Sequence, residues 1–383
     1  MRIAIFTDTY LPYTSGVTTH IRILKEGLEK KGHQVLIVTV DPTVPNYIFK
    51  DNVLYCPGIA IKKIYGYGVT NPLSFHRLDI IRKFNPDIIH IQTEFAIGMF
   101  GLWASRRLKK PVIYTLHTMY DDYTNYVFPH YAERVGKSVS HRYFHIIAAH
   151  ANEIIVPSKK AITFLERCKV KRQVNFIPNI AEPVTENKEK TKEIKEKYHL
   201  NDAEAVLCFA GRLGKEKSVD VLLTLTKELL KKHPSIKLFV VGGGPEEQNL
   251  KDLAKKLNIE NNVVFTGMVP HEEVIPYFHA SDLYVTASTS EMNSISALEA
   301  MNGGLMVLQR LDESNRYQII IGRNGWTFET PEEFCKLVDD YLKQSPKEKL
   351  EMRNMVISYS EKYGMEEFFS KVLEVYHSVT DAD

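Results

Sequence analysis

Two glutamates beside a predicted helix start form the clearest chemical pattern in this chain, in the segment ASTSEMNSISALEAMNGGLM at residues 287–306. Glu291 lies in the turn before the helix, and Glu299 lies eight positions later, inside it. The helix is predicted to begin near Asn293 or Ser294, because both are good N-cap residues. The first N–H groups of a helix favour an anion, whereas carboxylates accept hydrogen bonds from hydroxyl groups. The segment therefore predicts a site for a phosphate flanked by hydroxyl-rich groups, which is the chemistry of a nucleotide sugar.

A cationic loop follows another predicted strand, in the segment GRLGKEKSVD at residues 211–220. Arg212 and Lys217 would lie opposite the helix N-terminus and would neutralise the charge that develops on a departing diphosphate. An ordinary alternative stays open for both segments. Two glutamates around a helix start are also typical of capping and surface charge, and two cations in a loop are often simply solvated.

Glycines in two other loops would let the backbone approach a phosphate or a sugar without a Cβ in the way. Gly16 lies in SGVTTH and Gly243 lies in VVGGGPEEQNL, and an ordinary tight turn is the alternative for each. His117 follows the predicted strand VIYTL and stands beside Thr118 and Asp121. This position at a carboxyl strand end indicates a site residue, although a lone histidine is more often part of a core.

Short apolar runs alternate with helical patterns along the chain, and this alternation predicts the elements that hold these loops. It is typical of doubly wound parallel sheets, in which ligands bind at the carboxyl ends of the strands. A polar stretch rich in lysine and glutamate, residues 182–197, is predicted to connect two such sheets and to run into a short helix. The predicted strands are residues 1–6, 33–40, 88–91, 112–115, 153–157 and 174–178 before this stretch, and 205–210, 236–241, 262–266 and 283–286 after it.

Length and composition limit the class of protein. The 383 residues exceed one ordinary core and predict two domains of roughly 180 residues each. A formal net charge of +2 does not indicate nucleic acid as a partner. Four scattered cysteines without a CxxC pair favour a reducing compartment and no structural zinc. The start MRIAIFTDTY lacks a signal-peptide pattern, and no apolar run approaches the roughly 20 residues that span a bilayer, so we expect a cytoplasmic or peripheral membrane protein.

These motifs together resemble the retaining GT-B glycosyltransferases of family 4, the large family with sucrose synthase-like and phosphatidylinositol mannosyltransferase-like enzymes. Glu291, Glu299 and Gly303 match the glutamate pair of the family and the end of its helix. Arg212 and Lys217 match its diphosphate clamp. The resemblance implies an α/β fold of the GT-B type, with two Rossmann-like domains that face each other across a cleft.

The resemblance also implies what each part of the chain does. Residues 1–183 would form an acceptor and membrane domain, and residues 184–363 a nucleotide-sugar domain. A C-terminal helix of about residues 364–383 would pack back on the first domain. Two positions depart from the family pattern, because Ser294 replaces a usual glycine and Leu305 replaces a usual proline.

The implied reaction retains the configuration of the transferred sugar, with the departing phosphate helping to deprotonate the acceptor on the same face. No internal DxD motif is present, so we expect no metal requirement, and no cofactor is implied because the UDP-sugar is a substrate. His117 matches a family histidine that positions the sugar rather than acting as a general base. The implied catalytic residues are His117, Arg212, Lys217 and Glu291, and the implied donor-binding residues are Gly16, Arg212, Lys217, Gly243, Met292, Asn293, Ser294, Ile295 and Glu299.

Two segments narrow the resemblance to members that glucosylate diacylglycerol: IIHIQTEFAIGMFG at residues 88–101 and YTLHTMYDDYTNYV at residues 114–127. They imply UDP-glucose as donor and diacylglycerol in an anionic membrane as acceptor, on the inner face of the cell membrane. The apolar residues Met99, Phe100, Leu102 and Trp103 precede a basic cluster and could rest on such a surface, although a core-facing helix with a solvated basic end is the alternative. The implied acceptor or membrane residues are Trp103, Arg106, Arg107, Lys109, Lys110 and Tyr126.

Two other functions stay open at this point. One is a family 4 glycosyltransferase with a soluble acceptor or another lipid acceptor. The other is a catalytically silent GT-B protein that only binds a partner, which the departures at Ser294 and Leu305 make conceivable. The sequence does not distinguish glucose from galactose or N-acetylglucosamine, and it does not define the oligomeric state.

Overall fold

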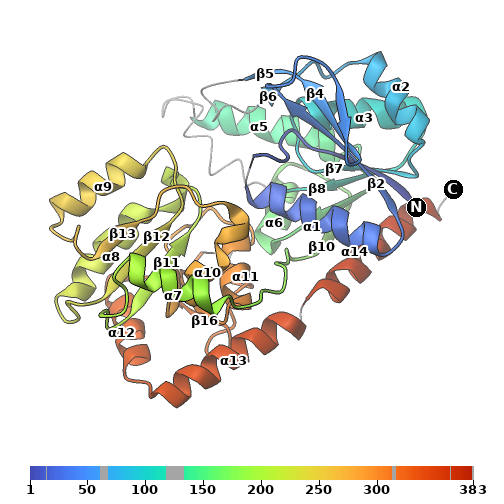
Figure 1. The fold of residues 1–383 in the computed structure, drawn as a ribbon. Helices are drawn as coiled ribbons and strands as arrows, with labels where there is room; N and C mark the ends of the chain where they lie inside the picture. The colour runs from blue at the N-terminus through green and yellow to red at the C-terminus, as the bar shows by residue number, and fades with distance from the viewer. Residues whose placement is uncertain (14, 61–67, 118–132, 313–315, 363, 382–383) are drawn as a thin grey trace. The chain divides into compact units, whose positions relative to one another are not determined.

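The computed structural model describes residues 1–13, 15–60, 68–117, 133–312, 316–362 and 364–381. The chain divides into two compact units (Figure 1). The first unit is Met1–Asn179 with Glu366–Asp383, and the second is Ile180–Met365. The boundary after Asn179 lies close to the position that the sequence predicts after residue 183.

One sheet of eight strands forms the centre of the first unit, in the order β10-β9-β8-β7-β1-β2-β4-β3. Its strands are β1 (Arg2–Phe6), β2 (Gln34–Asp41), β3 (Ile48–Lys50), β4 (Val53–Pro57), β7 (Ile88–Ile91), β8 (Val112–Thr115), β9 (Glu153–Val156) and β10 (Gln173–Phe176). All neighbours pair in parallel except β3 and β4. The chain leaves β1 toward β2 and later returns on the other side of β1 as β7. The loops that follow β1 and β7 therefore meet at the carboxyl edge of the sheet, where ligands bind in such folds.

Helices cover the faces of this sheet, and the last helix of the chain is one of them. Gly27 leaves room for this contact, because a Cβ on Gly27 would lie 1.8 Å from the Phe369 ring. The ring of Tyr376, on the same last helix, is fully buried in the unit. The helices are α1 (Gly16–Lys30), α2 (Phe75–Phe84), α3 (Ala96–Leu108), α5 (Glu133–Ala148), α6 (Lys159–Arg167) and α14 (Met365–Thr380), and a small second sheet pairs β5 (Ile59–Ala60) with β6 (Gly68–Val69).

A six-stranded parallel sheet forms the centre of the second unit, in the order β13-β12-β11-β14-β15-β16. Its strands are β11 (Val206–Ala210), β12 (Lys237–Val241), β13 (Val263–Phe265), β14 (Leu283–Thr286), β15 (Met306–Arg310) and β16 (Gly325–Phe328). Every residue of β11 is buried, as expected for a central strand covered on both faces. The strand order reverses between β11 and β14, so the loops that follow these two strands must lie side by side.

The helices of the second unit follow its strands in the alternation that the sequence predicts. They are α7 (Lys188–Lys197), α8 (Val219–Leu230), α9 (Glu247–Lys256), α10 (Ile275–His279), α11 (Ile295–Asn302), α12 (Pro331–Leu342) and α13 (Pro346–Lys362). A capping box of Thr330 and Glu333 fixes the start of α12. The polar stretch predicted to connect the two sheets ends in α7, as expected. The predicted α/β fold with two Rossmann-like domains is confirmed.

Candidate active site

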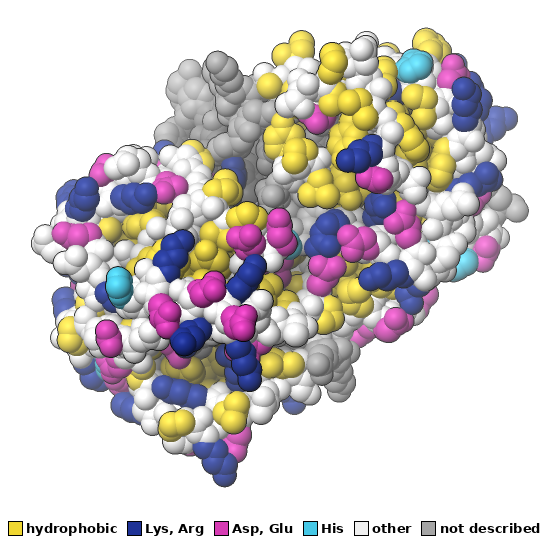
Figure 2. Space-filling view, viewed as in Figure 1, with side chains coloured by type: hydrophobic (Ala, Val, Ile, Leu, Met, Phe, Trp, Pro, Cys, Tyr) yellow, Lys and Arg dark blue, Asp and Glu magenta, His cyan; other side chains and the backbone are white. Residues whose placement is uncertain are grey.

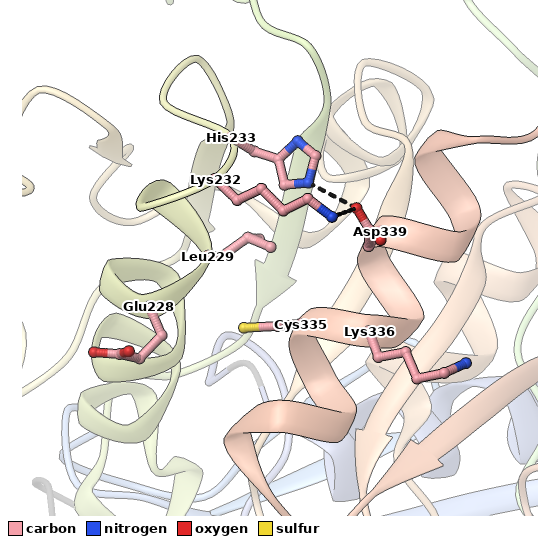
Figure 3. Close-up of a pocket in the computed structure, with 7 residues that line it drawn as sticks. All are labelled: Glu228, Leu229, Lys232, His233, Cys335, Lys336 and Asp339. Atoms are coloured by element: carbon pink, nitrogen blue, oxygen red, sulfur yellow. Dashed lines mark hydrogen bonds and ion pairs between the residues drawn. The ribbon is translucent and has the colours of Figure 1, made fainter.

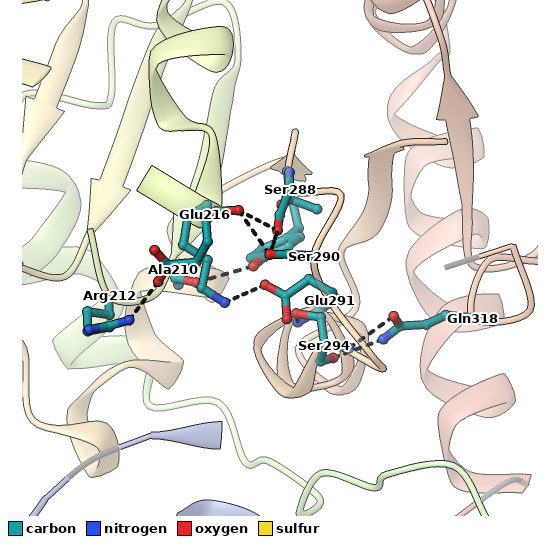
Figure 4. A network of polar contacts seen from close by, with 12 residues as sticks. Ala210, Arg212, Glu216, Ser288, Ser290, Glu291, Ser294 and Gln318 are labelled. Atoms are coloured by element: carbon teal, nitrogen blue, oxygen red, sulfur yellow. Dashed lines mark hydrogen bonds and ion pairs between the residues drawn. The ribbon is translucent and has the colours of Figure 1, made fainter. Parts of the chain in front are cut away.

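Lys217 and Glu291 are brought together at the carboxyl edge of the second sheet (Figure 4). Lys217 ends a short 3-10 turn, Lys215–Lys217, which follows β11, and Glu291 lies in the turn between β14 and α11. The Lys217 ammonium group donates to the Glu291 carboxylate, and both side chains stay partly exposed. A cation and an acid that the sequence places in one site thus form an ion pair there.

Arg212 is held by a residue that sequence reasoning missed. Its Nη2 lies 2.7 Å from Oε1 of Glu216, in the loop that also carries Lys217. The Glu216 side chain is only 3% exposed, whereas that of Arg212 is 34% exposed. The guanidinium group is therefore anchored on a buried carboxylate while part of it reaches solvent.

The backbone of Glu216 connects the two loops. Its carbonyl oxygen accepts from the Ser288 hydroxyl at 3.0 Å and from the Ser290 hydroxyl at 3.2 Å. Ser288 is fully buried, and both serines belong to the turn that leads to Glu291. The separation of the two loops is therefore defined by hydrogen bonds as well as by the sheet.

The start of α11 is fixed by Ser294, as the sequence predicts. The Ser294 hydroxyl accepts from the Ala297 N–H group at 3.4 Å. The Gln318 amide accepts from the Ser294 N–H group at 3.1 Å and donates to the Ser294 carbonyl at 2.9 Å. The serine that replaces the usual glycine therefore has a structural role as the N-cap. Because the side chains of Met292 and Ile295 are buried, a ligand would meet these residues through their backbone, whereas Asn293 is partly exposed.

Glu299 lies on α11 and contacts a histidine that the sequence analysis did not find. Its Oε1 lies 2.6 Å from Nε2 of His271, and its side chain is nearly buried. At the end of β11, the Tyr284 hydroxyl donates to the Ala210 carbonyl at 3.2 Å. Burial, with Glu291 nearby, raises the pKa of Tyr284 well above its usual value, so this phenol stays protonated and supports the end of β11.

Gly243 is buried against neighbouring loops. Its carbonyl accepts from the Leu213 N–H group at 2.9 Å, and a Cβ on Gly243 would lie 3.1 Å from the backbone nitrogen of Met268. A Cβ on the adjacent Gly244 would lie 2.6 Å from the Leu213 backbone. The close approach of these loops therefore accounts for glycine at both positions, which is the ordinary alternative for this motif.

His117 lies at the end of β8 in the first unit, within a group of buried polar side chains. Its Nε2 lies 2.5 Å from Oε1 of Gln92, and its ring meets that of His20 edge-on at 4.7 Å between centroids. Burial, with His20 and His90 nearby, holds the pKa of His117 well below its usual range. The imidazole is therefore neutral at physiological pH and is suited to hydrogen bonding rather than to carrying charge.

His90 links the same group to the last helix. Its Nδ1 lies 2.8 Å from the Tyr376 hydroxyl and its Nε2 lies 2.7 Å from the Thr115 hydroxyl. Burial lowers the pKa of His90 to about 3 and that of His20 to about 4. These histidines are far apart in the sequence, so no local pattern could have identified them as neighbours of His117.

Comparison with known proteins identifies the family. Residues 14–183 match the model of Glycosyltransferase Family 4, and residues 190–363 match that of Glycosyl transferases group 1. The alpha-monoglucosyldiacylglycerol synthase of Streptococcus pneumoniae is 34% identical over 330 residues, which cover 80% of this chain and 70% of the relative. The enzyme with the same name from Acholeplasma laidlawii is 30% identical over 359 residues, or 90% and 89% of the two chains.

The chain is a family 4 glycosyltransferase. Its fold agrees with that assignment. The crystal structure of Anabaena HepE in complex with UDP and glucose superimposes with a TM-score of 0.74 at 15% identity, over 99% of this chain and 100% of that chain. The predicted GT-B class is thereby confirmed.

Two site predictions in this glycosyltransferase remain, Gly16 and Tyr126. Gly16 is exposed and is the first residue of α1, which Ser15 caps by accepting from the Thr18 N–H group. Tyr126 lies outside the described residues, so its predicted role as an acceptor or membrane residue stays a prediction.

The predicted apolar face of α3 is partly wrong. Phe100 and Leu102 are buried in the core of the first unit and cannot rest on a membrane in this conformation. Trp103 is partly exposed, and the Arg107 guanidinium lies 5.5 Å above its ring. The predicted basic cluster does reach solvent, with Arg106, Arg107 and Lys109 exposed and Lys110 partly exposed.

A cavity of about 180 Å³ in the second unit lies apart from these residues (Figure 3). It is lined by the C-terminal end of α8 and by α12, where Asp339 pairs with Lys232 and His233. Since α8 starts beside Lys217 and runs to the opposite edge of the sheet, this cavity cannot belong to the Lys217 site.

Among the described residues, no helix has the length and apolar character to cross a bilayer, and no three His, Cys, Asp or Glu side chains are grouped to hold a metal ion.

Proposed function

We propose that this glycosyltransferase transfers glucose from UDP-glucose to diacylglycerol, with retention of configuration, and forms α-monoglucosyl-diacylglycerol. The observation that supports a nucleotide-sugar donor is the arrangement of Arg212, Lys217 and Glu291 on two loops that are hydrogen-bonded to each other. Two cations meet the diphosphate, and the acids Glu291 and Glu299 accept hydrogen bonds from sugar hydroxyls. HepE, which has the same fold, has been solved with UDP and glucose.

The proposed retention requires the diphosphate to leave from the face of the sugar that the acceptor attacks. Arg212 and Lys217 stabilise the negative charge that develops on the diphosphate as the bond to the sugar breaks. The departing phosphate oxygen then accepts the proton of the acceptor hydroxyl on the same face of the sugar. His117, which is neutral, positions the sugar by hydrogen bonding. Because side-chain cations meet the diphosphate charge, the reaction requires neither a metal ion nor another cofactor.

Diacylglycerol is proposed as the acceptor because of the relatives of this chain. Both alpha-monoglucosyldiacylglycerol synthases named above match this chain over both of its units. An acceptor that lies in a bilayer requires a surface of the enzyme that tolerates lipid, and the first unit has one. We therefore place the enzyme peripherally on the inner face of the cell membrane.

The proposed lipid-facing surface consists of β3, β5 and the start of α2. Phe49 is 60% exposed, Ile59 is 78% exposed and Phe75 is 70% exposed, although exposed aromatic and aliphatic side chains of this size are costly in water. The Phe75 ring meets that of Trp103 edge-on at 5.4 Å. Figure 2 shows hydrophobic side chains gathered on this face of the first unit.

Charge near the same surface favours an anionic bilayer. Lys50 follows Phe49, and Arg106 and Arg107 lie on the exposed end of α3 beside Trp103. Each cation near an anionic surface contributes on the order of 1 kcal/mol to binding. Aromatic rings at the level of the headgroups and flanking cations are the usual combination in proteins that lie on a membrane.

The experiment that tests the proposal is incubation of the purified protein with a panel of nucleotide sugars, with and without vesicles that contain diacylglycerol and anionic lipid. The proposal predicts transfer from UDP-glucose and a product that appears only with diacylglycerol. Transfer from another nucleotide sugar would correct the donor. Transfer to a water-soluble acceptor by a protein that does not sediment with the vesicles would overturn the lipid acceptor.

A further inference from the structure

Glu216 contacts both loops of the donor site through different atoms (Figure 4). We propose that Glu216 is a positioning residue for sugar transfer: its carboxylate holds Arg212, and its carbonyl holds the turn that carries Glu291. The inference rests on the proposed function, because it takes Arg212 to be a ligand of the donor diphosphate.

The carboxylate of Glu216 is placed for one partner. It is almost fully buried, and Gly214 provides its space, because a Cβ on Gly214 would lie 2.2 Å from a Glu216 carboxylate oxygen. A buried carboxylate is stable only when it is paired or hydrogen-bonded, and Arg212 supplies that contact at 2.7 Å. The guanidinium group has five N–H donors in a fixed plane, and the contact to Glu216 fixes the orientation of that plane.

The backbone carbonyl of Glu216 contacts the other loop of the site. It accepts from the hydroxyl groups of Ser288 and Ser290, which belong to the turn before Glu291. Lys217 follows Glu216 in the chain, so the same hydrogen bonds also determine where the Lys217 backbone lies relative to that turn. One residue thereby sets the relative positions of both cations and of the first acid.

The expected gain is preorganisation. An arginine side chain that must be ordered when the ligand binds loses rotamer freedom, and this loss weakens binding. Glu216 removes most of that loss beforehand. We therefore expect Glu216→Ala to weaken UDP binding by about tenfold, even though it adds net positive charge next to the diphosphate. Glu216→Gln retains an oxygen that can accept from Arg212, and we expect it to bind UDP within about threefold of the unchanged protein.

The decisive test is a double-mutant cycle with Arg212→Gln, with UDP as the probe and its affinity measured by ligand-observed NMR. Arg212→Gln keeps a hydrogen-bond donor for Glu216 but has no charge for a diphosphate. If Glu216 acts through Arg212, the tenfold loss caused by Glu216→Ala disappears in the Arg212→Gln background. The same tenfold loss in both backgrounds would overturn the inference, because a merely structural role does not depend on Arg212.

A matched control is Glu228→Ala, which removes a partly exposed glutamate that pairs with Lys231 at 2.5 Å at the other end of α8. It should leave UDP binding unchanged, and thermal melting should show that every variant is folded. If Glu216→Ala does not fold, Glu216→Leu takes its place in the cycle, because leucine also removes the acceptor for Arg212. A loss of about tenfold in Glu216→Leu that is absent from the Arg212→Gln background supports the inference, and unchanged UDP affinity together with unchanged turnover in Glu216→Leu overturns it. Failure of the unaltered protein to bind UDP would instead overturn the proposed function.

Discussion

The ammonium group of Lys217 is ion-paired with the carboxylate of Glu291, and this contact joins the loops that follow β11 and β14. The two residues are 74 positions apart, and the strand order brings their loops to the same edge of the sheet. In the proposed mechanism Lys217 binds the donor diphosphate and Glu291 binds a sugar hydroxyl. Glu291 and the diphosphate then compete for the same ammonium group.

Glu291→Gln is predicted to change donor binding and catalysis in opposite directions. Removing the competing charge should tighten UDP binding by about two- to fivefold, which is the range expected for a partly exposed ion pair. Sugar transfer should nevertheless slow by at least about tenfold, because the sugar loses a charged hydrogen-bond acceptor. Calorimetry with UDP and initial-rate kinetics measure the two effects. If Glu291→Gln lowered both the UDP affinity and the rate of sugar transfer, Glu291 and the diphosphate would not compete for Lys217.

Lys217→Ala should abolish sugar transfer and leave the fold intact. The loss of a cation that stabilises the departing diphosphate is expected to lower kcat/KM by about a hundredfold or more. Lys215→Ala is the matched control, because Lys215 is an exposed lysine in the same short turn and should be replaceable without loss of turnover. Unchanged turnover in Lys217→Ala, measured beside an unchanged melting temperature, would refute the diphosphate clamp.

Much of this site could be predicted from local sequence because the elements are short and sharply bounded. The apolar runs Ile88–Ile91 and Leu283–Thr286 are β7 and β14 with the predicted bounds, and Ser294 is the predicted N-cap of α11. Parallel strands place the loops that follow them at one edge, so Lys217 and Glu291 could be expected in one site. Their direct pairing could not, since it depends on side-chain rotamers.

The stability of the protein should fall as the pH drops from about 7 to about 5. His20 and His90 have pKa values of about 4 and about 3 in the folded chain, against an ordinary value of about 6.5. Below about pH 6.5 the unfolded chain therefore takes up protons that the folded chain does not. Each histidine should remove about 1.4 kcal/mol of unfolding free energy per pH unit in this window. Above about pH 6.5 these histidines should no longer lower the free energy of unfolding.

Urea denaturation across that pH range measures this effect. His90→Gln should remove roughly a third of the pH dependence, because His20 and His117 are also held neutral, whereas the replacement of the exposed His150 by Gln should not change it. Burial raises the pKa of Asp8, which acts in the opposite direction, but a single carboxyl cannot cancel two imidazoles. A stability that stays constant between about pH 7 and about pH 5 would show that these histidines are not held neutral in the folded chain.

Phe75→Ser is predicted to separate membrane binding from donor binding. It removes an aromatic ring that is 70% exposed, so sedimentation with anionic vesicles should weaken by about tenfold while UDP affinity stays the same. Leu350→Ser provides the control, because Leu350 is an exposed leucine on α13 in the second unit. Equal losses in the two variants would indicate a general effect of surface apolarity and not a lipid-facing surface.

The parts that sequence analysis missed share one physical cause, which is that burial is a tertiary property. The helix α3 carries apolar residues on several sides, so its pattern could not show that Phe100 is buried and that Trp103 is partly exposed. No local pattern marks Phe49 and Phe75 as exposed, because their exposure depends on how the three-residue strand β3 and the start of α2 pack. Glu216 had one local sign, a glutamate between two lysines after Gly214, and such a triplet is equally typical of a solvated loop.

The most direct test of the account is the structure of the product that forms from UDP-glucose and diacylglycerol in anionic vesicles, with the anomeric configuration of the new bond determined by NMR. The account predicts glucose attached to diacylglycerol in the α configuration, formed without an added metal ion and lost in Lys217→Ala. A β-linked product, or no glucosylated lipid from protein that is folded and binds UDP, would contradict it.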